Sequence, residues 1–260
     1  MKFDLKIPSV LLRRACEIDV IGIGGTGSAL LPGLMQLHHA LLQLGHPYGL
    51  HVTAYDPDEV SPSNIGRQGF FPADIGQNKA ILLVNRLNMA WGTSWTAVPE
   101  RYRYCDGIKR DADIVIGCVD SRKSRASIKE ILENRLRSWL YIDSGNNENT
   151  GQVILGEILK SGKKKLPLAW ELFPEIVDVQ GDEQDDVPSC SVAASLERQS
   201  LFINRAISLE VLNLLWRLFR HGSLDFHGSF VNLQTGRVVP LPIDTLVWKK
   251  MGYVYQSRKN

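Results

Sequence analysis

Short apolar runs alternate with longer, partly polar stretches through the first 160 residues. The apolar runs predict buried strands over residues 18–23, 51–55, 96–98, 112–119, 140–143 and 152–159. The longer stretches predict helices: a largely apolar one over 28–44, another over 77–90, and a charged amphipathic one over 121–136. Strands that alternate with helices form a mostly parallel central sheet flanked by helices on both faces. The pattern therefore predicts an α/β fold.

The pattern changes after residue 160. Residues 161–189 are mostly polar, with three lysines at 163–165 and an acidic run at 181–186, so we expect a mobile loop there. Apolar residues at helical spacing then predict a long helix, or two helices, over 191–219. Two apolar runs at 226–233 and 237–241, joined by Gln-Thr-Gly, predict a hairpin. We therefore expect a C-terminal helix and a small antiparallel β extension.

Composition narrows the class of protein. The chain has 260 residues, of which 44% are apolar and 22% are charged, and its net charge is +2. Such a weak charge indicates no nucleic-acid partner. No apolar run reaches the roughly 18 residues of a membrane span, and residues 1–10 lack a signal-peptide core. The cysteines are scattered, without a C-x-x-C pair, as is typical of a reduced cytoplasmic protein. They are Cys16, Cys105, Cys118 and Cys190.

A glycine-rich turn follows the first predicted strand. Gly22, Gly24 and Gly27 have the G-x-G-x-x-G spacing of a nucleotide-binding turn, which would make the fold Rossmann-like. The glycines allow a tight turn, close backbone approach to phosphate, and close packing of the helix on the strand. The N-terminus of that helix offers free N–H groups to an anion. By itself the motif is a weak signal, and a simple packing turn is the alternative.

Three charged residues follow the glycine turn. Asp56 ends the second predicted strand, where a carboxylate can accept both ribose hydroxyls, or can simply cap a turn. Arg67 lies in a long loop over 59–75; its guanidinium suits phosphate oxygens, although a solvated surface arginine is the alternative. Lys79 opens the next helix, where it could add its charge to the helix N-terminus or face solvent.

A fourth charged residue ends a buried strand. Asp120 follows the predicted strand at 112–119, at the edge where open α/β sheets bind ligands. A carboxylate beside phosphates is a natural Mg²⁺ ligand. The alternative is that Asp120 only caps the helix that starts at Ser121.

Taken in order, these motifs resemble those of the ThiF, MoeB and ubiquitin-activating adenylyltransferases. The matching motifs are Gly22-x-Gly24-Gly25-x-Gly27-Ser28, Asp56-x-Asp58, Asn64-x-x-Arg67-Gln68, Gly76-x-x-Lys79 and Asp120-x-x-x-x-Arg125. The resemblance covers residues 15–155, with a weaker echo over 190–219. A narrower resemblance is to the ThiF-family component of plasmid-borne bacterial PRTRC systems. It rests on Leu44-Gly45-His46-Pro47, Asp56-Pro57-Asp58, Gly66-Arg67-Gln68 and Pro188-Ser189-Cys190-Ser191.

The resemblance implies a reaction and a role for each motif. The C-terminal carboxylate of a ubiquitin-like or sulfur-carrier-like protein would attack the α-phosphate of ATP and release pyrophosphate. Gly24, Gly25 and Gly27 would line the phosphates and Asp56 would hold the ribose. Asn64, Arg67 and Lys79 would stabilise phosphate charge, and Asp120 would hold Mg²⁺. Gly22, Asp58 and Gln68 belong to the same nucleotide-binding set.

The resemblance also implies a cysteine that accepts the acyl group as a thioester. Cys190 is the candidate, because it follows the acidic run and opens the predicted long helix, whose N-terminus would favour the thiolate. A buried structural cysteine is the alternative. Relatives further imply a conjugating-enzyme-like partner and a homodimer.

The sequence departs from the family in two respects. The two C-x-x-C pairs that hold zinc in many relatives are absent, so we expect no zinc. An N-terminal arginine that reaches the partner subunit's ATP is not evident; Arg13 or Arg14 could replace it or be solvated. We divide the chain into a nucleotide-binding adenylation domain (1–160), a mobile crossover loop (161–189) and a C-terminal helix and hairpin that complete the same domain (190–260).

Two other functions remain open from the sequence. An NAD-dependent oxidoreductase would explain the glycine turn and Asp56, but not the series Arg67, Lys79 and Asp120. A non-catalytic scaffold that keeps the fold would have no need of that charged series.

Overall fold

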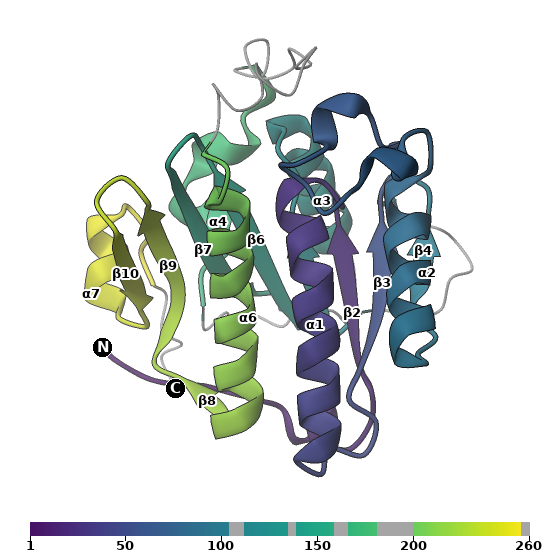
Figure 1. The fold of residues 1–260 in the computed structure, drawn as a ribbon. Coiled ribbons are helices and arrows are strands. Elements are labelled where there is room, and N and C mark those ends of the chain that lie inside the picture. Colours follow the sequence, from purple (N-terminus) through teal and green to yellow (C-terminus); the bar gives the residue numbers. More distant parts are fainter. Residues whose placement is uncertain (104–111, 135–138, 159–165, 181–199, 256–260) are drawn as a thin grey trace.

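An eight-stranded sheet forms the centre of the molecule (Figure 1). We describe it from a computed structural model, which covers residues 1–103, 112–134, 139–158, 166–180 and 200–255. The strands are β2 (Cys16–Ile21), β3 (Leu50–Tyr55), β4 (Thr96–Val98), β5 (Ile114–Gly117), β6 (Leu140–Asn146), β7 (Thr150–Glu157), β9 (Phe226–Asn232) and β10 (Arg237–Pro242). Their order across the sheet is β10-β9-β7-β6-β5-β2-β3-β4. The five neighbouring strands β6, β5, β2, β3 and β4 are parallel to one another. Strands β7, β9 and β10 extend the sheet beyond β6 through antiparallel pairs.

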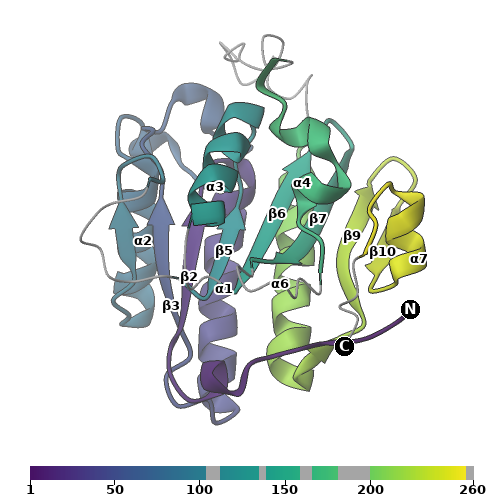
Figure 2. The same cartoon turned by 180° about the vertical axis from the view of Figure 1, so that it is seen from behind.

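Helices cover both faces of the sheet. One face carries α1 (Gly25–Gln43), α2 (Lys79–Trp91) and α6 (Ile203–His221), and the other carries α3 (Arg122–Asn134) and the short α4 (Ala169–Leu172) (Figures 1 and 2). The expected Rossmann-like α/β architecture, with a mostly parallel sheet, is confirmed. The predicted hairpin is β9–β10, and it extends the main sheet through the pairing of β9 with β7.

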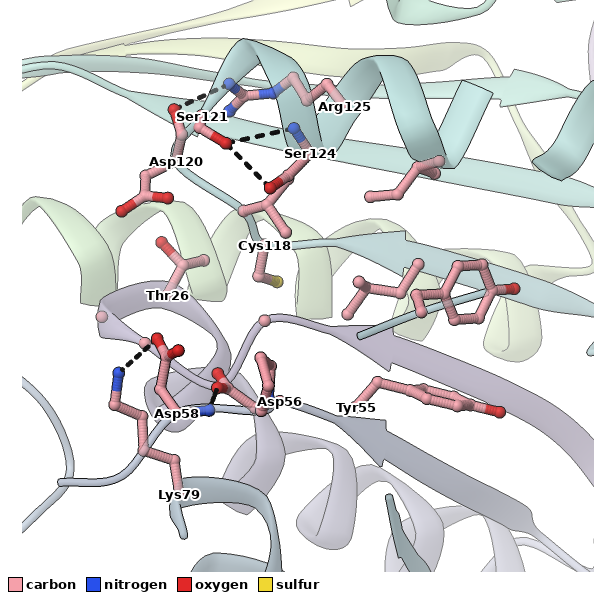
Figure 3. Close-up of a pocket in the computed structure, with 18 of the residues that line it drawn as sticks. Thr26, Tyr55, Asp56, Asp58, Lys79, Cys118, Asp120, Ser121, Ser124 and Arg125 are labelled. Atoms are coloured by element: carbon pink, nitrogen blue, oxygen red, sulfur yellow. Dashed lines mark hydrogen bonds and ion pairs between the residues drawn. The ribbon is translucent and has the colours of Figure 1, made fainter. Parts of the chain in front are cut away.

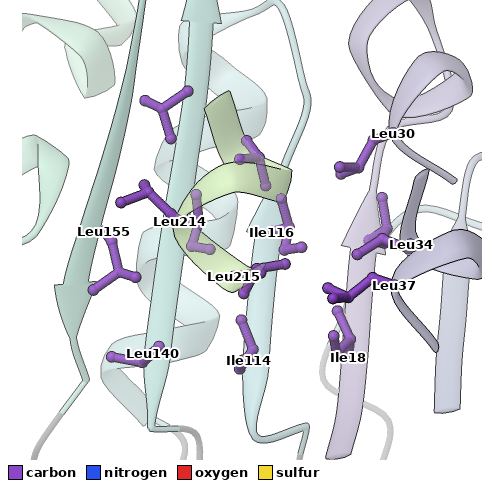
Figure 4. Packing of buried hydrophobic residues seen from close by; sticks show 14 of the residues in the cluster. Ile18, Leu30, Leu34, Leu37, Ile114, Ile116, Leu140, Leu155, Leu214 and Leu215 are labelled. Carbon is purple, nitrogen blue, oxygen red and sulfur yellow. The ribbon is translucent and has the colours of Figure 1, made fainter. Parts of the chain in front are cut away.

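Strand β5 shows why the central strands are almost wholly apolar. Ile114 and Ile116 pack towards α1 and α6, in a cluster that also includes Leu34 and Leu215 (Figure 4). Val115, between them, belongs to the second cluster, on the face covered by α3. A parallel strand buried on both faces needs apolar side chains at every position rather than at alternate ones.

The ends of several elements differ from the sequence expectations. The first strand stops at Ile21 rather than residue 23, because Gly22 has a φ of +87° and turns the chain. Helix α1 begins at Gly25, inside the glycine turn, rather than at residue 28. The long C-terminal helix is described from Ile203, and residues 191–199 of its predicted span lie outside the described residues.

Some elements were not predicted. Residues 166–180 fall in the expected mobile loop, yet they contain α4 and the 3-10 turn η4 (Pro174–Val177), with Leu168 and Trp170 buried. The pair β1 (Leu5–Lys6) and β8 (Ser223–Leu224) and the helix α7 (Thr245–Lys250) were also missed, as were the short 3-10 turns η2 (Pro62–Asn64) and η3 (Pro72–Asp74). A further 3-10 turn, η1 (Ser9–Leu12), precedes β2. Among the described residues, no helix is both long and apolar enough to cross a membrane.

Candidate active site

A cavity lies where the strand order reverses. Strand β2 has β3 on one side and β5 on the other. The helices that follow β2 and β5, α1 and α3, lie on opposite faces of the sheet, so the two connections diverge at the carboxyl ends of these strands. Such a switch point leaves a crevice that binds ligands in open α/β sheets. The crevice is a cavity of about 550 Å³ that opens above the glycine turn.

The glycine turn forms the floor of this cavity. A Cβ on Gly22 would lie 2.9 Å from the backbone oxygen of Cys118, and one on Gly27 would lie 2.0 Å from the oxygen of Gly22. These two glycines therefore bring β2, β5 and α1 together. Gly24 differs, because a Cβ there would meet only Gln68 Nε2, at 3.9 Å, beside the open cavity. Gly24 has no side chain to cap the first N–H groups of α1, which leaves them to a ligand.

The position of Asp56 is compatible with both roles that the sequence left open, capping a turn and accepting ribose hydroxyls. Its carboxylate accepts hydrogen bonds from Ile23 N at 2.5 Å and Asp58 N at 2.8 Å, which is a turn-capping arrangement. It also lines the cavity. Burial raises the pKa of Asp56, and the two backbone N–H groups and Lys79 act in the opposite direction. Each carboxylate oxygen has a further lone pair, so the cap does not prevent a ribose contact.

Lys79 is held over the cavity rather than released into solvent. It is the first residue of α2, after Asn78, whose side chain accepts a hydrogen bond from Ile81 N at 3.0 Å and caps the helix. Only 7% of Lys79 is exposed, and its Nζ lies 3.2 Å from Asp58 Oδ2 (Figure 3). The Asp58 side chain is 65% exposed, so an incoming phosphate could replace it as the partner of the lysine.

Arg67 and Asp120 both line the cavity. Arg67 lies in the loop between η2 and η3 and is half-buried. Burial lowers the pKa of Arg67, while the negative charge of Asp120 acts to raise it. Gln68, next to Arg67, also lines the cavity. Figure 3 shows Asp120 across the cavity from the Asp58–Lys79 pair, with Thr26 between them.

Asp120 does not cap α3. Ser121 does so instead, because its Oγ accepts a hydrogen bond from Ser124 N at 3.1 Å. The backbone oxygen of Asp120 accepts from Arg125 Nη1 at 3.2 Å, and Arg125 Nε lies 3.3 Å from the buried carboxylate of Asp143. This arrangement leaves the Asp120 carboxylate directed at the cavity (Figure 3).

Aromatic and apolar side chains also line the cavity. Tyr55 and Tyr102 meet edge to face, with ring centroids 4.9 Å apart. Ile21, Val119 and Ile128 line the cavity as well. Cys118 also reaches the wall; burial raises its pKa to about 12, so its thiol stays protonated at neutral pH. The cavity therefore combines charged groups with aromatic and apolar side chains, which suits a molecule with phosphates and a planar base.

The comparisons with known proteins identify the family. The model of the ThiF family matches residues 11–238. The chain belongs to the ThiF family. No curated protein matches it. Among solved structures, selenomethionine PaaA has a TM-score of 0.56 at 14% identity, covering 87% of this chain and 64% of that one.

Two structures of MccB from E. coli are similar at the same identity of 14%. MccB with succinimide has a TM-score of 0.56, and MccB with AMPCPP and selenomethionine MccA has one of 0.55. Each match covers 88% of this chain and 64% of MccB, so the ThiF-family chain spans less than two thirds of the length of these structures. At this identity, the likeness establishes a shared fold.

Most of the predicted site residues of this ThiF-family chain meet in the cavity. Those on its wall are Gly22, Gly24, Gly25, Asp56, Asp58, Arg67, Gln68, Lys79 and Asp120. Gly27 lies beneath the turn as a packing residue. Asn64 is buried inside the loop, where its side chain accepts from Ser61 N at 2.9 Å and its backbone oxygen accepts from Gln68 N. Cys190 lies outside the described residues.

The N-terminal arginines do not meet the cavity of their own chain. Arg14 donates two hydrogen bonds to the Asp113 carboxylate, through Nη1 at 2.7 Å and Nη2 at 2.5 Å. This pair ties the segment before β2 to the start of β5, which is a structural role.

Sequence reasoning missed the contribution of α6. Asn204 lines the cavity and receives a hydrogen bond from Thr26 Oγ1 at 3.1 Å. A Cβ on Gly25 would lie 2.5 Å from the Asn204 side chain, so the second glycine of the GG pair exists partly to admit this asparagine. The available signal was a buried polar residue on an otherwise apolar helix face, at Asn204 and Ser208.

Proposed function

We propose that this chain catalyses the ATP-dependent adenylation of a carboxylate at the C-terminus of a small protein. The observation that carries the proposal is the convergence of Arg67, Lys79 and Asp120 on one cavity above the glycine turn, from three separate segments of the chain. Membership of the ThiF family supports it. Further support comes from the fold it shares with MccB, which has been solved with ATP and with AMPCPP and MccA.

The residues fit the parts of ATP. The open N–H groups of α1 and the cations Arg67 and Lys79 suit the phosphates, and Asp56 suits the ribose. The edge-to-face pair of Tyr55 and Tyr102 suits the base.

In the proposed reaction, an oxygen of the substrate carboxylate bonds to the α-phosphorus of ATP as pyrophosphate leaves with the electrons of the broken P–O bond. This chain contributes position and charge. Lys79 and Arg67 face oxygens on which negative charge grows in the transition state, inside a cavity that limits water. Lys79 is already oriented by Asp58, so little reorganisation is needed when phosphate takes the place of that carboxylate.

A Mg²⁺ ion fits the same arrangement. The described residues hold no cluster of three or more His, Cys, Asp or Glu side chains. At nucleotide sites Mg²⁺ typically takes one or two carboxylates together with substrate phosphates, so Asp120 is the residue that would hold it. When bound, Mg²⁺ would neutralise phosphate charge and orient the leaving group.

The family resemblance extends the proposal to substrate and partners. We propose a ubiquitin-like protein as the acyl substrate, as in the PRTRC subgroup, with a conjugating-enzyme-like partner and a homodimeric enzyme. Cys190 would then take the acyl group as a thioester and release AMP. The Cys190→Ala variant should keep ATP–pyrophosphate exchange and lose the thiol-sensitive conjugate. A conjugate that persists in this variant would show that another residue is the acceptor.

Thermal unfolding tests the proposal before the substrate is known. A ligand that binds only the folded state raises the unfolding temperature, so MgATP should stabilise the chain and NAD should not. The competing oxidoreductase hypothesis expects the reverse. Pyrophosphate exchange into ATP, measured with and without a ubiquitin-like protein, then tests catalysis. Stabilisation by NAD alone would overturn the proposal.

A further inference from the structure

A buried ion pair lies behind the connection that carries Asp120. Asp143 of β6 is 1% exposed, and its Oδ1 lies 3.3 Å from Arg125 Nε of α3. We propose that Asp143 is a positioning residue that holds Arg125 as its counter-ion and thereby leaves the Asp120 carboxylate available to Mg²⁺. The inference rests on the proposed function, from which it takes the ATP cavity and the role of Asp120 towards the metal.

The guanidinium of Arg125 ties this connection to β6. Its Nε faces the Asp143 carboxylate, and its Nη2 donates to the backbone oxygen of Ser144 at 3.5 Å. Its Nη1 donates to the backbone oxygen of Asp120 at 3.2 Å. The planar fork of an arginine fixes these directions together. Since Asp120 lies between β5 and α3, the position of its backbone depends on how Arg125 is held.

Glycines on two strands make room for the ion pair. Gly117 of β5 pairs with Asp143 of β6, and a Cβ on Gly117 would lie 2.3 Å from Tyr141 Oη. That hydroxyl donates to Asp143 Oδ1 at 3.0 Å. A Cβ on Gly145 would lie 3.2 Å from Arg125 Nη2. The sheet is therefore shaped around the carboxylate and the guanidinium.

Folding stability does not explain the pair well. Asp143 Oδ2 is buried and has no hydrogen-bond partner among the described residues. The attraction within a buried ion pair repays the loss of hydration only when the remaining lone pairs are also satisfied. Apolar side chains of similar volume would avoid this cost. An incompletely satisfied pair next to a ligand cavity is better explained by what it positions.

Two carboxylates compete for the charge of Arg125. The pKa of Arg125 is raised: burial acts to lower it, but the charge of Asp143, and to a smaller extent that of Asp120, raises it. Figure 3 shows the Asp120 carboxylate pointing away from the Arg125 guanidinium. Without the charge on Asp143, Arg125 would be drawn towards Asp120, and that ion pair would compete with Mg²⁺.

Calorimetric titration of the full chain with ATP, in Mg²⁺ and again in EDTA, tests the inference without requiring catalysis. The Asp143→Asn variant keeps the shape of the side chain and removes its charge. Asp113→Asn is the matched control, because Asp113 is also a buried carboxylate paired with an arginine, Arg14, but does not line the cavity. Both variants break a pair, so both should unfold at a lower temperature than the wild type without ligand.

Mg²⁺ should tighten ATP binding by the same factor in the wild type and in Asp113→Asn. In Asp143→Asn this factor should be about tenfold smaller, the usual cost of losing a residue that orients a metal ligand, while affinity in EDTA stays within about twofold. A merely structural role would weaken both affinities alike. That result, or an unchanged Mg²⁺ factor in Asp143→Asn, would overturn the inference.

A second variant covers the case in which Asp143→Asn does not fold. Arg125→Lys keeps the charge but loses the fork, so lysine cannot hold the three oxygens together. It should show the same loss of the Mg²⁺ factor with little change in EDTA. An intact Mg²⁺ factor in Arg125→Lys would also overturn the inference.

ATP–pyrophosphate exchange separates the two claims. A selective loss of the Mg²⁺ factor in Asp143→Asn, but no exchange by the wild type with any acyl substrate, would leave the inference standing and overturn the proposed function. Exchange by the wild type, with an unchanged Mg²⁺ factor in Asp143→Asn, would do the opposite. A wild type that does not bind MgATP would overturn both.

Discussion

Arg67 and Lys79 are cations that the fold keeps partly out of water beside carboxylates. Burial lowers the pKa of Arg67, yet the guanidinium remains charged because its ordinary pKa is so high. A desolvated cation that must exchange its protein partner for phosphate is suited to transition-state stabilisation, since its charge is poorly screened. At the scale of single residues, these two side chains are where we expect activity to be most sensitive.

The Arg67→Ala variant should lose ATP–pyrophosphate exchange by about 10²–10³-fold, the usual cost of one transition-state donor. Its thermal unfolding without ligand should stay close to that of the wild type. Arg237→Ala is the control, because Arg237 is exposed on the edge strand β10, away from the cavity. Exchange at a near wild-type rate in Arg67→Ala would contradict the assigned role.

His227 gives a pH prediction that concerns stability rather than activity. It is fully buried, with Nδ1 2.7 Å from Leu155 O and Nε2 accepting a hydrogen bond from Trp248 Nε1 at 2.8 Å. These contacts require the neutral ring with its proton on Nδ1. Burial lowers the pKa of His227 from 6.5 to about 4.

Stability should therefore fall as the pH drops from about 6.5 to about 4, because the unfolded state takes up a proton that the folded state refuses. The full effect is about 3 kcal/mol of the free energy of unfolding. Urea unfolding over this pH range measures it. The His227→Gln variant, which cannot titrate, should lose this part of the pH dependence; parallel curves for the two proteins would refute the assignment.

The turn between β2 and α1 is the element that decides whether nucleotide can bind. Its glycines have different neighbours, so substitutions at different glycines test folding stability and nucleotide binding separately. Gly27→Ala would place a Cβ 2.0 Å from Gly22 O and should destabilise the chain by about 3 kcal/mol. Gly24→Ala meets only Gln68 at 3.9 Å, so it should keep its stability.

The Cβ of Gly24→Ala does, however, enter the space beside the first N–H groups of α1. The stabilisation by MgATP in thermal unfolding should therefore be lost in Gly24→Ala, although the ligand-free unfolding temperature stays close to that of the wild type. A variant that binds MgATP as the wild type does would show that phosphate does not approach this turn.

On the scale of the whole molecule, the N-terminal segment is joined to β8 and to the start of α7, away from the cavity. Leu5 of β1 pairs with Leu224 of β8, and both are 1% exposed. Met1 N donates to Thr245 Oγ1 at 2.7 Å, next to α7. In Figure 1, β8 lies towards the bottom of the view, whereas β2 points with its carboxyl end towards the top.

Leu5→Ala should therefore lower the free energy of unfolding by about 2–4 kcal/mol, as expected for a buried leucine. The increase in unfolding temperature that MgATP gives should be unchanged, because the contact does not reach the cavity. Val10→Ala, at an exposed position in the same segment, is the control. A loss of the MgATP effect in Leu5→Ala would show that the two regions are coupled.

Much of the fold could be predicted because hydrophobic pattern alone distinguishes buried parallel strands from amphipathic helices. Strand β4 was placed at its observed bounds, and α2 and β3 within two residues. The ends of β2 and α1 were misplaced because glycine conformation, rather than apolarity, decides them. Helix α4 was missed because Leu168 and Trp170 are too few to give a helical period, and residues far away in the sequence bury them, as Tyr141 does for Trp170.

The sequence by itself determined the succession of strands and helices along the chain. It also determined the position of the glycine turn and of the charged residues that follow it. Side-chain type and spacing are local properties, and they were enough to indicate an anion site at the carboxyl ends of strands. Only the tertiary structure decided which of these residues share a cavity. It turned Asn64 inward, gave the cap of α3 to Ser121, and brought in Asn204 from α6. Gly145 of β6, Gln152 of β7 and Phe230 of β9 likewise lie side by side only because of the strand register. Hydrogen bonds between the strands fix this register, and no local sequence pattern encodes it.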